Sequence, residues 1–160
     1  MNILGLDLGT KTGWAAYHGS CGGAMNSGMQ DFSLKRGESP GMKFLRFRAW
    51  LDVMQALLNP IDVLYYEQAH HRGGAATQSA YGLITDVLAF AAQHNIQTSA
   101  IHTGTLKKYA TGRGNAKKPE MIEAARALGF NIEDDNEADA ILIRKFAMWE
   151  LLREVGQEGP

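Results

Sequence analysis

The chain has almost no cysteine, no long apolar run and almost no net charge. Its 160 residues include a single cysteine, Cys21, which excludes an intramolecular disulfide and a zinc site built from cysteines. No apolar stretch approaches the roughly 18 residues of a membrane-spanning helix. The first residues also lack the basic segment followed by an apolar core that is typical of a signal peptide. We therefore expect a cytoplasmic protein.

The formal net charge of −1 gives no support by itself to a nucleic-acid partner, but the charges are unevenly distributed. Five of the 16 lysines and arginines lie between Lys107 and Lys118, with no acid among them. Four of the 17 acids lie between Glu133 and Glu137, and Asp139 follows closely. The chain thus carries one basic and one acidic cluster that nearly cancel.

Length and composition predict one domain, residues 1–155, followed by a short tail, residues 156–160. An apolar fraction of 45% is enough for an ordinary core, and there is no internal repeat or linker. The periodicities predict strands at 3–8, 13–17, within 23–32, at 61–66 and at 97–102. They predict helices at 42–58, 75–94, 119–128 and from Asp134 to about 155, with a basic loop at 103–118.

This order of elements predicts an α/β domain with a mixed sheet, in which early hairpins are antiparallel and later strands follow crossovers. The predicted inward residues of helix 42–58 are Leu45, Trp50, Leu51, Met54, Leu57 and Leu58. Those of the last helix are Ala138, Ile141, Leu142, Phe146, Trp149 and Leu152.

Helix 75–94 is apolar on two sides, so it must be covered on two sides. One stripe holds Leu83, Val87 and Phe90, and the other holds Tyr81, Ile84 and Leu88. One side can pack on the sheet. The other can pack on a neighbouring helix or on the same helix of a second subunit.

Three carboxylates lie in apolar segments that are expected to be buried. Asp7 lies inside the apolar strand 3–8, Glu67 ends the strand 61–66, and Asp139 lies between two alanines in the last helix. A buried carboxylate costs several kcal/mol unless it is paired. Taken alone, Asp7 fits equally well as an acid that caps the turn before Gly9.

Carboxylates that gather at one place repel each other unless a cation joins them. Oxygen ligands suit Mg²⁺ or Mn²⁺ rather than zinc. Two such ions support in-line attack on a phosphodiester. At the start of the last helix, Asp135 and Asn136 can share a face with Asp139. Asp134 is the expected N-cap, with Glu137 completing a capping box.

The basic cluster would supply the substrate side of such a site. Its five cations could neutralise several phosphates, although an isolated run of this kind is more often a solvated loop. The nearby acids favour the phosphate interpretation. The cations are Lys107, Lys108, Arg113, Lys117 and Lys118.

Four motifs, in this order, resemble the RuvC family of Holliday junction resolvases, within the RNase H-like nucleases. They are Gly-Leu-Asp-Leu-Gly-Thr around Asp7, Tyr-Glu-Gln around Glu67, the Lys-Lys…Gly-x-Gly-x-Ala-x-Lys segment and Glu-Ala-Asp-Ala around Asp139. The chain is similar to the shorter phage members, and the resemblance covers about residues 3–152. It implies an RNase H-like five-stranded sheet in which strands one and four are adjacent.

The resemblance implies a Mg²⁺-dependent endonuclease, with Mn²⁺ able to substitute, that nicks opposed strands of four-way DNA junctions in recombination and repair. It implies a homodimer in contact near helix 75–94, in the cytoplasm of a bacterium or a phage-infected host, with no membrane and no small-molecule cofactor. The implied catalytic residues are Asp7, Glu67, Asp139, Lys107 and Lys118, with Asp135 and Asn136 as further metal ligands. Lys11, His70, His71, Arg72, Lys108, Arg113 and Lys117 would contact DNA.

Two positions depart from the family's pattern. Three residues before the last aspartate the family usually has a second acid, whereas this chain has Asn136, with Asp135 one position earlier. Either Asp135 is recruited or a second metal is held more weakly. In the loop after Glu67, His70 and His71 stand where family members can present an aromatic that stacks into the junction. Broader activity on branched DNA fits this change.

Three other functions compete with this one. The segment Asp-Leu-Gly-Thr-Lys-Thr-Gly also resembles the first phosphate loop of the actin and sugar-kinase group, but those enzymes need two domains. Asn136, which stands where the family usually has an acid, would fit an architectural protein that binds junctions without cutting them. An RNase H-fold nuclease that acts on RNA would use the same chemistry.

Overall fold

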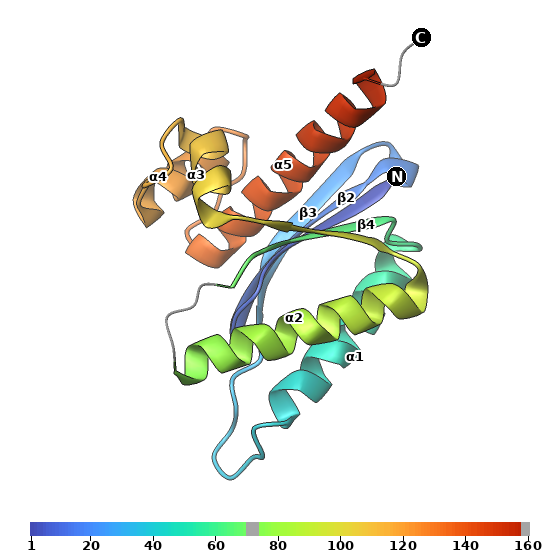
Figure 1. The fold of residues 1–160 in the computed structure, drawn as a ribbon, viewed down its shortest axis with the longest axis vertical. Helices are drawn as coiled ribbons and strands as arrows, with labels where there is room; N and C mark the ends of the chain where they lie inside the picture. Colours follow the sequence, from blue (N-terminus) through green and yellow to red (C-terminus); the bar gives the residue numbers. More distant parts are fainter. Residues whose placement is uncertain (70–73, 158–160) are drawn as a thin grey trace.

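The computed structural model describes residues 1–69 and 74–157 and contains one five-stranded mixed sheet (Figure 1). Its strand order is β3-β2-β1-β4-β5. β1 pairs antiparallel with β2 and parallel with β4, β2 pairs antiparallel with β3, and β4 pairs parallel with β5. The predicted α/β architecture, with strands one and four adjacent, is confirmed. The strands are β1 (Asn2–Asp7), β2 (Lys11–His18), β3 (Ala24–Asp31), β4 (Val63–Glu67) and β5 (Gln97–Ile101).

Helices cover both faces of this sheet (Figure 1). On one face lie α1 (Met42–Leu58) and α2 (Ala75–His94); on the other lie α3 (Thr103–Thr111), α4 (Lys118–Arg126) and α5 (Asp135–Gln157). A short 3-10 turn, η1 (Gly19–Cys21), joins β2 to β3. Side chains alternate along the buried strands, so that Ile3 packs with α5 whereas Leu4 and Leu6 pack with α1 and α2. The sheet therefore separates two apolar clusters.

α5 crosses β1 and β2 at two glycines, and this close approach positions the start of the helix. A β-carbon built on Gly5 would lie 2.8 Å from the backbone nitrogen of Arg144. One built on Gly13 would lie 1.8 Å from the backbone oxygen of Asn136. Only residues without a side chain allow the helix to lie this close.

Several predicted boundaries agree with the structure and others do not. The two helices at 42–58 and 75–94 have the predicted limits. The basic segment is not all loop, because residues 103–111 form α3, whose Leu106 is fully buried. β2 begins at Lys11, two residues before the predicted strand 13–17. α4 begins at Lys118, so Pro119 is its second residue, and the helix ends at Arg126.

The predicted apolar faces of α1 and α5 are partly wrong. Leu45 and Leu57 of α1 are exposed, and Phe47 is buried on the face that packs. In α5, Trp149 and Leu152 are exposed by 39% and 63%, whereas Ala147 and Leu151 are buried, so both residues lie off the face of the helix that packs on the core. The remaining predicted positions of both helices are buried or packed against the two clusters.

α2 has the two different sides that its sequence predicts. Leu83, Val87 and Phe90 are buried against the sheet, whereas Tyr81 and Leu88 are exposed. Within the described residues, none of the helices is long and apolar enough to cross a bilayer. Ile84, the third residue of the predicted outer stripe, is partly buried against the inner cluster, so this part of the prediction is wrong.

Candidate active site

Three carboxylates from three elements converge at one edge of the sheet. The parallel register pairs Leu6 of β1 with Tyr66 of β4, so the next residues, Asp7 and Glu67, end adjacent strands side by side. Asp139 comes from the second turn of α5, which Gly13 allows to lie against β2. The predicted grouping of Asp7, Glu67 and Asp139 is therefore present in the fold.

Burial and the charge of neighbouring carboxylates raise the pKa values of Asp7 and Asp139. Burial raises the pKa of Asp7 well above its ordinary value, and repulsion from Asp139, Glu67 and Asp135 raises it further. Burial, followed by repulsion from Glu67 and Asp135, raises the pKa of Asp139 to about 7. Lys107 and Lys118 partly offset this repulsion at Asp139. The cluster thus holds negative charge at a cost, as sites for cations do.

One oxygen of this cluster has no partner. Oδ1 of Asp139 is buried and makes no hydrogen bond within the described residues. A buried polar atom without a partner costs about 1–3 kcal/mol. Asp7 and Glu67 also line a hollow of about 160 Å³, beside Ile84 of α2. Space, charge and oxygen donors all fit a hard divalent cation.

The described residues do not contain a preassembled metal cage. No three His, Cys, Asp or Glu side chains of residues 1–69 and 74–157 lie close enough to hold an ion together. The carboxylates would therefore have to move together around a cation.

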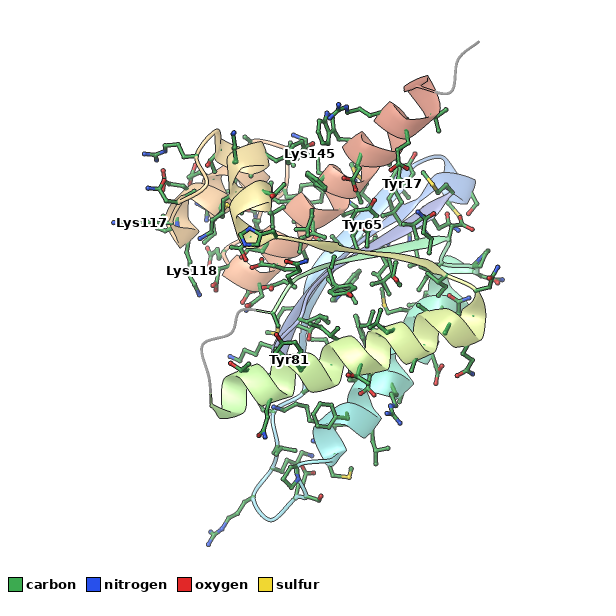
Figure 2. The ribbon with its side chains drawn as sticks, viewed as in Figure 1. Tyr17, Tyr65, Tyr81, Lys117, Lys118 and Lys145 are labelled. Carbon is green, nitrogen blue, oxygen red and sulfur yellow. The ribbon has the colours of Figure 1, made fainter. Side chains whose placement is uncertain are left out.

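Asp135 and Asn136 differ from each other in their surroundings. Asp135 forms an ion pair with Lys118, which comes from the start of α4 (Figure 2). This contact raises the pKa of Lys118. Asn136 places its backbone oxygen against Gly13. Asp135, which adds its charge to the three carboxylates, is thus already paired with a lysine.

The capping box predicted at the start of α5 is only half present. Oδ1 of Asp134 accepts a hydrogen bond of 3.0 Å from the backbone N–H of Glu137, as an N-cap does. The Glu137 carboxylate accepts a hydrogen bond of 2.7 Å from the Ser27 hydroxyl of β3 instead. The prediction for Glu137 is therefore wrong, because a tertiary partner replaces the local one.

Two contacts at the site were missed by the sequence analysis. The hydroxyl of Thr103, the first residue of α3, donates a hydrogen bond to Glu67. Lys43 of α1 donates hydrogen bonds of 2.9 Å to the hydroxyls of Thr10 and Ser79. It thereby ties the turn after Asp7 to α1 and α2. Both contacts join residues more than 30 positions apart, so no local pattern could reveal them.

The predicted DNA-contacting cations surround the site at different depths. Lys107 lies near Asp139, whereas Lys108 and Lys117 are exposed. Arg113 forms an ion pair with Glu120. Hydrogen bonds from Ser33 lower the pKa of Asp31, and the charge of Lys11, which is exposed at the start of β2, lowers it further. The predicted residues His70, His71 and Arg72 lie outside the described residues.

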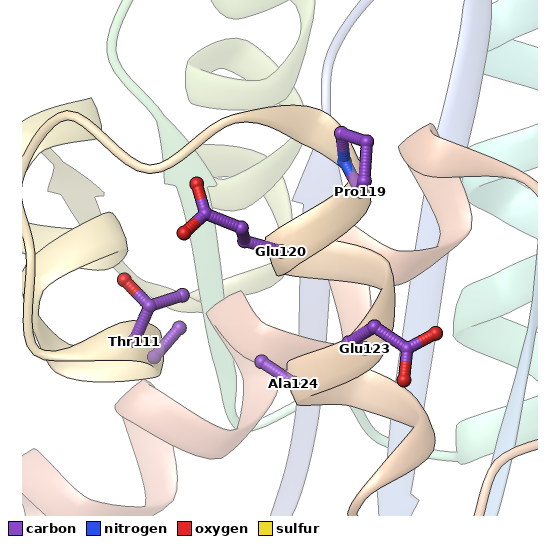
Figure 3. A pocket seen from close by; sticks show the side chains of 6 residues that line it. Thr111, Pro119, Glu120, Glu123 and Ala124 are labelled. Carbon is purple, nitrogen blue, oxygen red and sulfur yellow. The ribbon is translucent and has the colours of Figure 1, made fainter.

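A second hollow, of about 380 Å³, lies between α3 and α4 (Figure 3). Its lining includes Glu120 and Glu123. Glu120 forms an ion pair with Arg113, and Glu123 forms one with Arg126. Its acids are therefore already neutralised, unlike the three carboxylates at the sheet edge.

Comparison with solved structures identifies the architecture. Thermus thermophilus RuvC in complex with a Holliday junction substrate matches with a TM-score of 0.74 and 19% identity over 90% of each chain. A second Thermus thermophilus RuvC structure matches with a TM-score of 0.72 and 21% identity, over 96% of this chain and 97% of that one. The chain has the RuvC fold.

The RuvC fold confirms the RNase H-like architecture expected from the motifs. No protein-family model matches the chain. No curated protein matches it by sequence. At such low identity the likeness to RuvC establishes the fold, and the chemistry has to be argued from the chain's own residues.

Proposed function

We propose that the chain is a metal-dependent endonuclease that cuts branched DNA, with four-way junctions as its main substrate. The observation that carries this proposal is the convergence of Asp7, Glu67 and Asp139, with raised pKa values for Asp7 and Asp139 and a buried oxygen without a partner. A carboxylate cluster of this kind is costly to maintain unless it serves a ligand. The RuvC fold supports the choice of substrate class.

Asp7, Glu67 and Asp139 would hold Mg²⁺, with Mn²⁺ as a substitute. Asp135 and Asn136 would be further ligands. The bound cations would supply a nucleophilic water and charge for the leaving oxygen of a phosphodiester. In the protein itself, Thr103 orients Glu67 by its hydrogen bond. Carboxylates bind a hard cation only when ionised, so a proton held by Asp7 or Asp139 must leave first.

The lysines would bind the substrate phosphates beside the carboxylates. Lys107 lies near Asp139, and Lys118 is largely exposed while paired with Asp135. A cation that takes Asp135 as a ligand would free Lys118 for a phosphate oxygen. We assign Lys107 and Lys118 to the scissile phosphate. We assign Lys11, His70, His71, Arg72, Lys108, Arg113 and Lys117 to contacts with the rest of the DNA.

A homodimer is part of this proposal. Paired nicks on opposed strands of a junction need two active sites that face it together. The exposed stripe of α2, which includes Tyr81 and Leu88, offers an apolar surface for a second copy (Figure 2 labels Tyr81). The solved RuvC complex contains a Holliday junction substrate, which supports the same class of substrate for this chain.

The proposal is tested on an end-labelled, immobile four-way junction beside a linear duplex of the same sequence. Each is incubated with Mg²⁺, with Mn²⁺ and with EDTA. Metal-dependent nicks at opposed positions of the junction alone are the expected result. No nicking of the junction in either metal would overturn the proposal.

Gel-shift binding of the junction, a labelled RNA strand as a further substrate and an ATPase assay separate the competing functions. Binding of the junction without nicking would favour an architectural protein, and in that case Asn136→Asp should be tested for restored cleavage. Nicking of an RNA strand in preference to the junction would favour the ribonuclease. ATP hydrolysis without any nicking would favour the kinase-like fold group.

A further inference from the structure

We propose that a groove between α3 and α5 binds an unpaired DNA strand that leads away from the carboxylates; the substrate class rests on the proposed nuclease function. This α3–α5 groove has a volume of about 670 Å³. It is lined by Lys108 and Tyr109 of α3 and by Phe146, Trp149 and Arg153 of α5. Aromatic rings and cations interleave along it, which is the composition of single-strand binding sites.

The aromatic part of the groove is a connected cluster with one ring at the surface. The ring centres of Tyr109 and Trp149 are 5.3 Å apart, and those of Phe146 and Trp149 are 5.4 Å apart. Phe146 is buried, whereas Trp149 keeps 39% of its surface exposed. A rigid, partly exposed ring on a packed base suits the stacking of a nucleobase.

Two cations lie against these rings: Arg153, which lines the groove, and Lys145, which lies beside it. The guanidinium of Arg153 lies 4.6 Å from the centre of the Trp149 ring. Nζ of Lys145 lies 5.9 Å from the centre of the Tyr109 ring, on the side of α5 toward α3 (Figure 2). Contacts of this kind hold a cation in place while its donors stay available to a phosphate.

These cations have no acidic partner within the part of the chain that the structure describes. Lys108, Lys145 and Arg153 form no ion pair there, whereas Arg46, Arg48, Arg113, Lys118 and Arg126 each pair with a carboxylate. The acid in the groove lining, Glu150, accepts a hydrogen bond of 2.7 Å from the Tyr65 hydroxyl. The groove therefore has cations to offer to an anionic chain.

The groove begins where the carboxylate centre ends. His102 and Gly104 line it, and Thr103 between them donates its hydrogen bond to Glu67. Along α3, Lys107 acts on Asp139 while the next residue, Lys108, lines the groove. A strand held at the carboxylates can therefore continue into the groove without leaving the protein.

The test measures the binding of a fluorescent oligothymidine of about 12 nucleotides, within the range of single-strand sites, by anisotropy in EDTA. Two variants remove the groove's contributions: Trp149→Leu, and the double variant Lys145→Gln with Arg153→Gln. Each should raise Kd about tenfold, and Trp149→Phe should retain most of the affinity. The control is Lys35→Gln with Arg36→Gln, which removes the same charge in the β3–α1 loop at the other end of the molecule (Figure 1). It should stay within about twofold.

Equal affinity of the wild type and the double variant would overturn the groove proposal. Binding of an acidic peptide by a protein that does not bind the strand would also overturn it. Asp7→Asn separates the two proposals, because it should bind the strand as the wild type does. If the groove variants lose strand binding but the wild type does not cut junctions, only the proposed function is refuted. If the wild type cuts junctions but the groove variants bind the strand as well as it does, only the groove proposal is refuted.

Discussion

The backbone oxygen of Asn136 occupies the space that a side chain on Gly13 would need. A β-carbon at position 13 would lie 1.8 Å from this oxygen and 2.2 Å from the carbon that bears it. Gly13 pairs with Asp7 across β2 and β1. The same glycine therefore brings the start of α5, and with it Asp139, to the strand end that carries Asp7.

Gly13→Ala should push α5 away from the sheet. The clash is with backbone, which cannot rotate aside, so we expect a loss of about 3 kcal/mol in the free energy of unfolding. Junction cleavage should fall even under conditions in which the variant is folded. Urea denaturation measures the first effect, and Gly156→Ala is the control, since a β-carbon there meets nothing within 4 Å. Similar stabilities of the two variants would contradict the close packing.

Asp7→Asn should abolish cleavage and leave junction binding largely intact. In EDTA the variant should also be more stable than the wild type by about 1 kcal/mol, because it removes a carboxylate that its neighbours repel. Thermal unfolding and gel-shift binding measure the two effects. The control is Asp134→Asn, which removes the same charge but keeps an N-cap side chain. Loss of binding together with cleavage would mean that Asp7 has a structural role.

Lys107→Ala and Lys118→Ala should each lower the single-turnover cleavage rate by about 10²-fold, with a much smaller change in Kd. Contacts that strengthen as charge develops on the phosphate affect the rate more than ground-state affinity. Rapid-quench kinetics and anisotropy on the same junction separate the two quantities. Lys35→Ala, in the β3–α1 loop, is the control. Equal losses in rate and affinity would reassign both lysines to plain phosphate contacts.

Leu88→Glu should convert the proposed dimer to a monomer. Leu88 lies on the exposed stripe of α2, and a buried unpaired carboxylate at an interface is costly. Sedimentation velocity measures the mass. Leu152→Glu, at an exposed leucine on α5, is the control and should stay dimeric. A wild-type protein that sediments as a monomer at all concentrations would refute the dimer.

The sequence predicts those features that local chemistry determines. α1 and α2 have the predicted limits, since apolar periodicity and helix-breaking residues such as Pro60 are local signals. Asp7 and Glu67 could be placed together because both end core strands, and the resemblance to RuvC made those strands neighbours. The motifs thus predicted that β1 and β4 are adjacent and that the acids at their ends lie together.

Features that depend on distant partners could not be predicted. The lysines that follow Leu106 suggested a loop. Leu106 is buried, however, and its packing holds this segment as the helix α3. Leu45 was predicted to face inward, yet Phe47, Leu51 and Met54 form the buried face of α1 and Leu45 is exposed. The bond from Thr103 to Glu67 and those of Lys43 depend on contacts between segments far apart in the chain.

The central claim is that Asp7, Glu67 and Asp139 are held together for a cation. The pKa of Asp139, about 7, lies above its ordinary 3.8, so between these values the folded state keeps a proton that the unfolded state has released. The stability associated with this proton is complete below about pH 4 and is lost as the pH rises to about 7. Bound metal replaces the proton and should remove this loss.

The decisive measurement is therefore thermal unfolding of the wild type and of Asp139→Asn from pH 5 to 8, in EDTA and in Mn²⁺. In EDTA the wild type should lose stability relative to the variant as the pH rises, and at pH 8 the variant should be the more stable protein. Mn²⁺ should stabilise only the wild type and reverse that order. A parallel pH dependence of the two proteins, with equal or no effect of Mn²⁺, would contradict the account.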